Sequence, residues 1–249
     1  AGKIRKLGRV DHKDAYLDTD AQERERGITI FSKQAVFTYD DMEITLLDTP
    51  GHVDFSAEME RTLQVLDYAI LVINGMDGVQ SHTDTLWKLL KRYEIPTFIF
   101  VNKMDMDGSD KDAVFQNIRK KLDGDCVDFS SEDRDEQIAM ADERLLDTYL
   151  DSGTVETEDI IEAILDRKIF PCFWGSALKL SGVQELLDAM NTYMVMPAYN
   201  AEFGGRIFKI SRDAKGERLT YMKVTGGCLK CREQIEGTEG KVNQTLFFS

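Results

Sequence analysis

Three short polar motifs in this chain each follow directly on an apolar segment of strand length. They are Asp48-Thr49-Pro50-Gly51-His52, Asn102-Lys103-Met104-Asp105 and Gly175-Ser176-Ala177. Apolar runs of about four to eight residues, bounded by turn signals, are typical of buried strands. The carboxyl ends of parallel strands meet at one edge of a sheet, where open α/β folds bind their ligands. The pattern therefore predicts an α/β domain with a composite site at that edge.

Strand-like and helical segments alternate from Gln34 to about Met196. The expected strands are 34–39, 43–48, 69–74, 97–102 and 169–174. Helical spacing of apolar residues between them is found at Leu86, Leu89, Leu90 and Tyr93, and again at Ile160, Ile161, Ile164 and Leu165. Ser181, three residues before Gln184, predicts a capping-box start for a further helix. This alternation predicts a mostly parallel sheet covered by helices on both faces.

The pattern changes near Met196-Pro197. Beyond it short alternating strands are expected, at Gly204–Ser211, Arg218–Thr225 and Lys241–Phe248. We therefore expect two domains, an α/β domain over 1–197 and the opening of a β-barrel over 198–249 that stops before it can close. Within the first domain, residues 128–136 are strongly acidic and predict a solvated surface loop.

Charge and composition narrow the partners. The net charge of −14 would repel naked nucleic acid at long range, so a contact with a ribosome would have to be local. No apolar run is long enough to cross a bilayer and the start has no signal-peptide pattern, so we expect a cytoplasmic monomer without a membrane partner. Cys228 and Cys231 have zinc-knuckle spacing but no second pair, so a zinc site is the less favoured interpretation.

The motif that begins at Asp48 is suited to a nucleoside triphosphate. A carboxylate at a strand end can hold Mg²⁺ through a coordinated water, and a following Gly lets a backbone N–H approach the γ-phosphate. We assign these roles to Asp48 and Gly51, and assign to His52 the orientation of the attacking water. Thr29 can give its hydroxyl to Mg²⁺ and its backbone to the γ-phosphate. The alternatives are a helix-capping Asp48 and a structural His52.

The second and third motifs are suited to a guanine base. The Asp105 carboxylate can accept both the N1–H and the N2–H₂ of guanine, a donor pair that adenine lacks, while Asn102 supplies an amide. The aliphatic stem of Lys103 can lie on the base. The backbone at Ser176 and Ala177 can donate to the guanine O6. Together these residues predict GTP or GDP as the ligand.

One expected part of such a site is absent from these 249 residues. No Gly-Lys-Ser/Thr turn, the Walker A motif that wraps phosphates in backbone N–H groups, is present. Ala1-Gly2-Lys3 is followed by Ile4, which lacks the hydroxyl that binds Mg²⁺. We therefore expect the first strand and the P-loop to be missing, and GTPase activity to belong to a longer parent protein. For the fragment itself that activity stays open.

Taken together, the motifs resemble translational GTPases of the elongation factor G class. The matching segments are Gln22–Ile30, Asp48–Phe55, Gly78–Gln80 and Asn102–Asp105. The similarity is greater to the tetracycline-resistance ribosomal protection proteins, because the stretch from Asp105 to Gly175 is short and Phe208–Tyr221 resembles the opening of their second domain.

This resemblance implies a P-loop-type GTPase domain followed by a translation-factor β-barrel. It also implies a protein that binds GTP and Mg²⁺, docks on the ribosome, hydrolyses GTP to GDP and releases tetracycline. Three alternatives stay open. They are an elongation factor G-like translocase, a ribosome-binding module without hydrolysis and a purely structural α/β domain.

Overall fold

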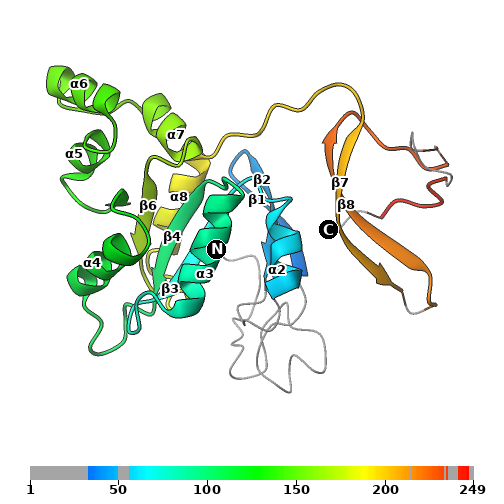
Figure 1. Cartoon of the computed structure of the whole chain (residues 1–249), viewed down its shortest axis with the longest axis horizontal. Helices are drawn as coiled ribbons and strands as arrows, with labels where there is room; N and C mark the ends of the chain where they lie inside the picture. The colour runs from blue at the N-terminus through cyan, green and yellow to red at the C-terminus, as the bar shows by residue number, and fades with distance from the viewer. Residues whose placement is uncertain (1–32, 50–55, 214, 233, 235–240, 247–249) are drawn as a thin grey trace. The chain divides into compact units, whose positions relative to one another are not determined.

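The structure, a computed structural model, describes residues 33–49, 56–213, 215–232, 234 and 241–246 (Figure 1). Its elements in chain order are β1 (Lys33–Tyr39), β2 (Met42–Asp48), α2 (Ser56–Leu63), β3 (Ala69–Asn74), α3 (Ser81–Arg92), β4 (Thr97–Asn102), α4 (Lys111–Lys121), β5 (Cys126–Asp128), α5 (Arg134–Ala139), α6 (Glu143–Ser152), α7 (Thr157–Leu165), β6 (Phe170–Trp174), α8 (Val183–Tyr193), β7 (Gly204–Arg212) and β8 (Arg218–Gly226). Two compact units result. Among the described residues, one holds 39–42 and 66–195, and the other holds 33–38, 43–65 and the residues from 196 onward.

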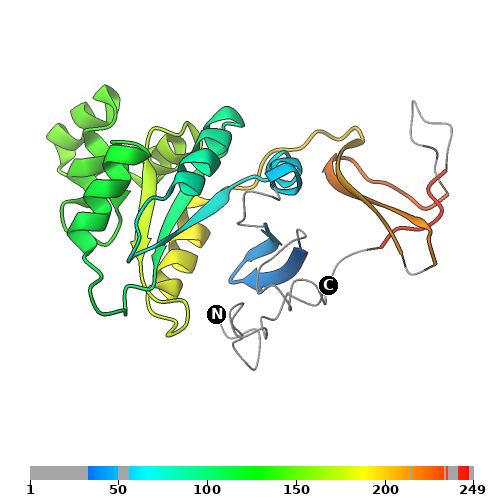
Figure 2. The ribbon, with the colours of Figure 1, turned by 60° about the horizontal axis from the view of Figure 1, so that its bottom comes forward.

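The first unit is built on a four-stranded parallel sheet with the order β3-β4-β6-β5. In the register of the sheet Asn74 lies beside Asn102, and Val101 lies beside Trp174, so β3, β4 and β6 end at one edge. Figure 2 shows α3 and α8 on opposite faces of this sheet. The predicted parallel sheet with helices on both faces is confirmed for three of its five strands. The strands expected at 34–39 and 43–48 form a separate two-stranded sheet, and β5, which the sequence pattern did not predict, takes the edge beside β6.

The predicted helical stripes are buried only in part. Leu86, Leu89 and Tyr93 of the first stripe are half-buried, and Leu165 of the second is 40% exposed. Trp87 and Leu90 of α3 are buried, and the Trp87 ring meets the Phe170 ring of β6 edge-on with centroids 4.6 Å apart. On α7, Ile160 and Ile164 are buried. Full burial of such side chains contributes about 1.5–3 kcal/mol each, and this holds α3 and α7 in the first unit.

The predicted capping box at the start of α8 is wrong. The residue that precedes the helix is Gly182, with φ 73°, and no side chain caps it. Ser181 instead pairs with Ser176 as an isolated bridge, in which the Ser181 N–H donates to the Ser176 carbonyl over 3.1 Å. Because the backbone of Ser181 pairs with Ser176, the helix begins one residue later than predicted, and Gly182 takes the capping position.

The prediction of a solvated loop over 128–136 is right only for residues 129–133, where Ser130, Glu132 and Asp133 are exposed, and is wrong at both ends. Its first residue, Asp128, ends the short buried strand β5, and the carboxylate is only 8% exposed. Helix α5 begins at Arg134, inside the same segment. The partners that make the burial of Asp128 possible, Lys111 and Trp174, lie far away in the sequence. Charge composition alone therefore could not reveal them.

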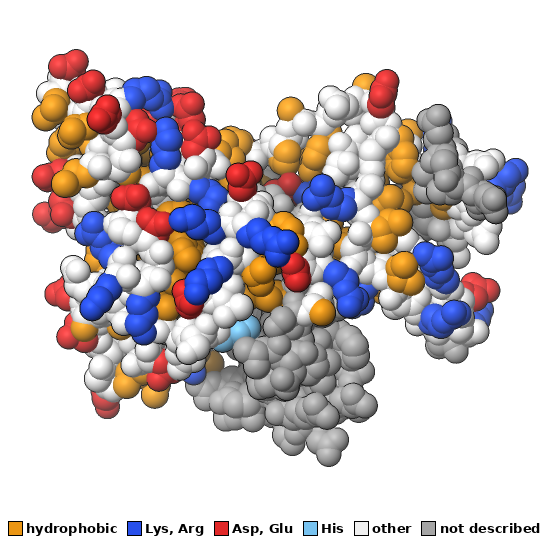
Figure 3. All heavy atoms as spheres, viewed as in Figure 1, with side chains coloured by type: hydrophobic (Ala, Val, Ile, Leu, Met, Phe, Trp, Pro, Cys, Tyr) orange, Lys and Arg blue, Asp and Glu red, His pale blue; other side chains and the backbone are white. Residues whose placement is uncertain are grey.

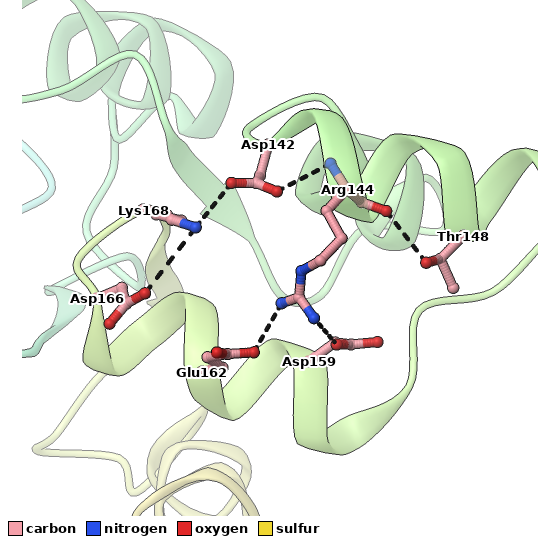
Figure 4. A network of polar contacts seen from close by, with 7 residues as sticks. All are labelled: Asp142, Arg144, Thr148, Asp159, Glu162, Asp166 and Lys168. Carbon is pink, nitrogen blue, oxygen red and sulfur yellow. Dashed lines mark hydrogen bonds and ion pairs between the residues drawn. The ribbon is translucent and has the colours of Figure 1, made fainter.

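An ion-pair network ties α6 to α7 and to the turn after α7 (Figure 4). The Arg144 guanidinium donates to Asp159 over 3.0 Å and to Glu162 over 2.7 Å. The Lys168 ammonium lies 2.7 Å from Asp142, and this pairing lowers the pKa of the Asp142 carboxyl. Exposed pairs of this kind contribute little individually, but together they favour one arrangement of these short helices.

The second unit contains two small sheets. β1 pairs with β2, and β7 pairs with β8 in an antiparallel hairpin that runs from Gly204 beside Gly226 to Arg212 beside Arg218. This hairpin confirms the first two strands predicted beyond the pattern change. The third, Lys241–Phe248, is wrong over its described part. Lys241 makes only an isolated bridge to Gln234, and residues 242–246 form no strand. A strand requires a neighbour along its length, and in the described part of this segment the bridge is joined only by a hydrogen bond from the Arg232 N–H to the Val242 carbonyl over 2.6 Å.

No helix within the described part of the chain is both long and apolar enough to cross a bilayer.

Candidate functional site

The loops that follow β4 and β6 lie against each other at the carboxyl edge of the parallel sheet. The Gly175 N–H donates to the Val101 carbonyl over 3.0 Å, and the Met104 N–H donates to the Gly175 carbonyl over 3.0 Å. Two of the three predicted motifs are therefore brought together through their backbones, as the strand ends predict.

Asn102 joins the two loops through its side chain. Its Oδ1 accepts from the Ala177 N–H over 2.9 Å and from the Lys103 N–H over 2.8 Å. With Oδ1 used in this way, the Nδ2 group, which donates two hydrogen bonds, is the part of the amide that a base can meet. A guanine O6 at Ala177 would share that N–H with Asn102.

The turn after Asn102 has a constrained backbone. Lys103 has φ 66°, a conformation that non-glycine residues rarely adopt and that is found often at functional sites. The Ser109 hydroxyl donates to the Met104 carbonyl over 3.0 Å, which ties the turn back on itself. Gly75, directly after β3, lies so close to this turn that a Cβ added to it would be 2.5 Å from the Met104 sulfur. The shape of the turn is therefore held from both sides.

Asp105, the predicted base-recognising carboxylate, has two donors from the loop after β6. The Ser176 hydroxyl hydrogen-bonds to it, and the Lys179 ammonium lies 3.1 Å from its Oδ2. The hydrogen bond from Ser176, and to a smaller extent the contact with Lys179, lower the pKa of the Asp105 carboxyl below its usual range. The group is therefore ionised at neutral pH and acts only as an acceptor.

The loop 175–182 that carries these donors is closed at its base by two glycines. An added Cβ on Gly175 would lie 2.1 Å from the Ser181 carbonyl oxygen, and one on Gly182 would lie 2.0 Å from the Trp174 carbonyl oxygen. Ser176 and Ser181 pair immediately above this crossing. Because only glycine allows so close an approach, the positions of Ser176 and Ala177 depend on both glycines.

A buried polar cluster supports the strand that leads into this loop. Asp128 Oδ1 accepts from the Trp174 indole N–H over 2.9 Å and from the Ser130 hydroxyl and N–H over 2.7 and 2.9 Å. Its Oδ2 pairs with Lys111 over 2.6 Å. Burial raises the pKa of Asp128, but these donors outweigh it and the net pKa is lowered. The cluster holds Trp174, the last residue of β6, directly before Gly175.

Sequence reasoning missed Lys179 and Asp128 as parts of this region. A signal for Lys179 was present, since it is a cation three residues after Ser176 in a loop expected to face a carboxylate. Asp128 carried no such signal, because an acidic residue in an acidic segment normally faces solvent.

The predicted phosphate and Mg²⁺ residues are mostly beyond the described part of the chain. Thr29, Gly51 and His52 lie outside the described residues. Asp48 is half-buried at the end of β2, as predicted. The described residues contain no group of three or more His, Cys, Asp or Glu that could hold a metal ion. Cys228 and Cys231 are exposed free thiols.

This geometry can recognise a planar base that has adjacent N–H donors. It offers an ionised carboxylate at Asp105, an amide at Asn102 and a long aliphatic stem at Lys103. All three lie at the end of β4 or in the loop that follows it, and hydrogen bonds hold this segment to the loop after β6. Such a preorganised set of polar groups discriminates strongly, because the wrong base leaves them unpaired.

Comparisons with known proteins agree with this geometry. Residues 1–196 match the family described as the elongation factor Tu GTP binding domain. Similar curated proteins include the tetracycline resistance protein TetP of Clostridium perfringens, 34% identical over 95% of this chain and 40% of that protein. The TetM protein from transposon Tn5251 of Streptococcus pneumoniae is 31% identical over 96% of this chain and 40% of its own length. The oxytetracycline resistance protein of Streptomyces rimosus is 34% identical over 94% of this chain and 40% of its own length.

The chain thus spans two-fifths of the length of these relatives. Among solved structures, a crystal structure of a Thermus thermophilus protein superposes with a TM-score of 0.78 at 22% identity, covering 93% of this chain and 43% of that one. At this identity the likeness shows the fold.

Proposed function

This chain belongs to the family of the elongation factor Tu GTP binding domain, and from that membership we propose that it is the guanine nucleotide-binding part of a ribosome-associated GTPase that protects against tetracycline. The observation that carries the proposal is the joining of the Asn102 and Ser176 loops around an ionised Asp105. The relatives' names supply the tetracycline role, and the chain's 40% share of their length makes that role a proposal for the whole protein.

In this proposal the base lies between the two loops. Asp105 accepts from N1–H and N2–H₂ of guanine, Asn102 offers Nδ2, and the Lys103 stem covers the base. The Ala177 N–H would donate to O6 while sharing its contact with Asn102 Oδ1, whereas the Ser176 N–H already donates to the Ser181 carbonyl over 2.9 Å. Adenine lacks the N1–H and N2–H₂ donor pair, so it would cover the Asp105 acceptor positions that face the base without donating to them, which is costly.

The phosphates and Mg²⁺ would be held by the earlier motifs. Thr29 and Asp48 would bind Mg²⁺, since a hydroxyl and a carboxylate are the oxygen donors that this ion prefers. The bound ion supplies neutralisation of the phosphate charge. Gly51 would donate its N–H to the γ-phosphate, and His52 would orient the water that attacks it.

A local positive surface supports contact with ribosomal RNA despite the net charge of −14. Figure 3 shows Lys and Arg side chains gathered over α3 and α4. The last turns of these helices carry Lys91 and Arg92, and Arg119, Lys120 and Lys121. Local clusters of this kind attract phosphate over roughly a Debye length, about 8–10 Å, whatever the total charge.

We further propose the division into 1–197 and 198–249, a translation-factor barrel that begins with the β7-β8 hairpin, and a cytoplasmic monomer. The match of residues 1–196 to one family supports the boundary. One change of compact unit also falls at Met196, while 33–38 and 43–65 group with the residues beyond it. The antiparallel hairpin supports the start of the second domain.

The proposal is tested on the full-length protein that contains this chain. GTP hydrolysis is measured with and without ribosomes, and peptide synthesis by tetracycline-inhibited ribosomes is measured with the protein added. We expect ribosome-stimulated hydrolysis and recovery of synthesis. A second assay asks whether the protein replaces elongation factor G in translocation, and we expect that it does not.

Each result has a distinct meaning. Translocation without recovery from tetracycline would assign the protein to the elongation-factor role. Ribosome binding without hydrolysis would make it a binding module. Failure to bind guanine nucleotide at all would leave a structural α/β domain and refute the proposal.

A further inference from the structure

Lys179 lies over the carboxylate proposed to recognise the base. Its Nζ is 3.1 Å from Asp105 Oδ2, with the two side chains 62% and 20% exposed. The Lys179 N–H donates to the Ser176 Oγ over 3.3 Å, and the Ser176 hydroxyl is itself bonded to Asp105. Carboxylate, hydroxyl and ammonium thus form one connected cluster. We propose that Lys179 is a positioning residue for guanine recognition, which holds the Asp105 carboxylate in the orientation that receives the base.

This proposal rests on the proposed function, because it concerns the base that Asp105 would bind. A carboxylate offers about four acceptor positions, two on each oxygen. Lys179 and Ser176 occupy two of them. The remaining two suffice for N1–H and N2–H₂ of guanine, so Lys179 keeps its contact when the base binds. It therefore acts as a support for Asp105 and does not compete with the base.

The backbone makes this support unusually rigid for an exposed lysine. Loop 175–182 is closed by the Ser176–Ser181 bridge and by the crossing of Gly175 and Gly182. Leu180, next to Lys179, has φ 59°, so the turn has a specific shape. Preorganisation of this kind reduces the conformational entropy lost when a contact forms. The backbone of loop 175–182 therefore holds the Cα of Lys179 in one position near Asp105.

The chain offers a matched control in another Lys–Asp pair. Lys168 lies 2.7 Å from Asp142, with side chains 39% and 19% exposed, within the network of Figure 4. Removing Lys168 deletes one positive charge and its partly exposed ion pairs, with Asp142 and, at 3.9 Å, with Asp166, without touching loop 175–182. A loss of nucleotide affinity caused by charge or general stability would therefore be found in both lysine variants.

The experiment uses the full-length protein and calorimetric titration with GDP. Exposed ion pairs make only a modest contribution, so Lys179→Ala should weaken GDP binding about threefold to fivefold. Lys179→Arg, which keeps the charge, should remain within about twofold of the wild type, and Lys168→Ala should be unchanged. Asp105→Asn provides the coupling test with xanthosine diphosphate. The neutral amide of the Asp105→Asn variant does not need the Lys179 ammonium. Adding Lys179→Ala to that variant should therefore change its affinity for xanthosine diphosphate less than about twofold.

Several results would overturn the inference. Equal or tighter GDP binding by Lys179→Ala would show that Lys179 is neutral or a competitor of the base. An equal loss with and without the Asp105→Asn substitution, or an equal loss in Lys168→Ala, would mean that the effect does not pass through the carboxylate. If the wild-type protein binds GDP and Lys179→Ala binds it with the same affinity, this inference fails and the proposed function stands. Absence of GDP binding by the wild type refutes the proposed function as well.

Discussion

Asp128 provides the sharpest stability test, because its four donor contacts divide between its two oxygens. Oδ1 accepts from the Trp174 indole and from both donors of Ser130, and Oδ2 pairs with Lys111. Asp128→Ala would leave the half-buried Trp174 indole N–H without an acceptor, at about 1–3 kcal/mol, whereas the donors of the exposed Ser130 can regain water and cost less. Lys111 is 43% exposed and can regain water, so its loss costs less. We expect a total destabilisation of about 2–4 kcal/mol.

Asp128→Asn separates the two oxygens. An amide oriented with its oxygen at the Oδ1 position keeps the three bonds from Trp174 and Ser130, but places an NH₂ group against Lys111. The cost should therefore be limited to the ion pair, about 1 kcal/mol after allowance for the solvent exposure of Lys111. Urea-induced unfolding followed by circular dichroism at pH 7 measures both variants. Glu132→Ala, in the exposed part of the same loop, should remain within about 0.5 kcal/mol of the wild type.

The pH dependence has a defined sign. Because the folded-state pKa of Asp128 is lowered, its contribution to stability is present above the unfolded pKa of about 3.9 and is lost as pH falls through the folded value. Wild-type protein should therefore lose its advantage over Asp128→Asn only on acidification below about pH 4. Equal destabilisation by Asp128→Ala and Asp128→Asn, or a cost near zero for Asp128→Ala, would refute this account of the cluster.

Four further outcomes are expected. In the full-length protein, His52→Ala should lower ribosome-stimulated GTP hydrolysis about a hundredfold and leave GTP affinity nearly unchanged, because water positioning matters in the transition state. A parallel loss of GTP binding in titration would make His52 a structural residue. Asp105→Asn should shift preference from guanosine to xanthosine triphosphate in competition binding, and retained guanine selectivity would remove Asp105 from the base site. Gly182→Ala should destabilise the protein by more than about 2 kcal/mol in urea, because its Cβ would lie 2.0 Å from a carbonyl oxygen at φ 73°. The isolated 249-residue polypeptide, which has no Gly-Lys-Ser/Thr turn, should bind GTP analogues only weakly, and submicromolar affinity in a mass-verified sample would contradict this.

Local patterns were enough to predict most of the elements. The strands at 69–74 and 97–102 and the stripe through Leu90 on α3 are repeated in the structure, because alternation and 3.6-residue spacing are properties of the backbone itself. The polar motifs at the ends of β4 and β6 also predicted which loops would meet, since parallel strands end at one edge. These inferences needed only neighbours along the chain and one rule of topology.

Contacts between distant segments were decided by the tertiary structure alone. The Asn102 side chain meets Ala177 across 75 residues, and Asp128 meets Trp174 across 46. Whether an acidic residue faces solvent or a buried indole depends on which groups the fold brings within about 3 Å, and composition contains no such distance. The same applies to Ser181, whose sequence context predicts a helix cap but whose backbone pairs with Ser176. Periodicity therefore determined the elements, while the donors around each carboxylate arose only when the strands packed together.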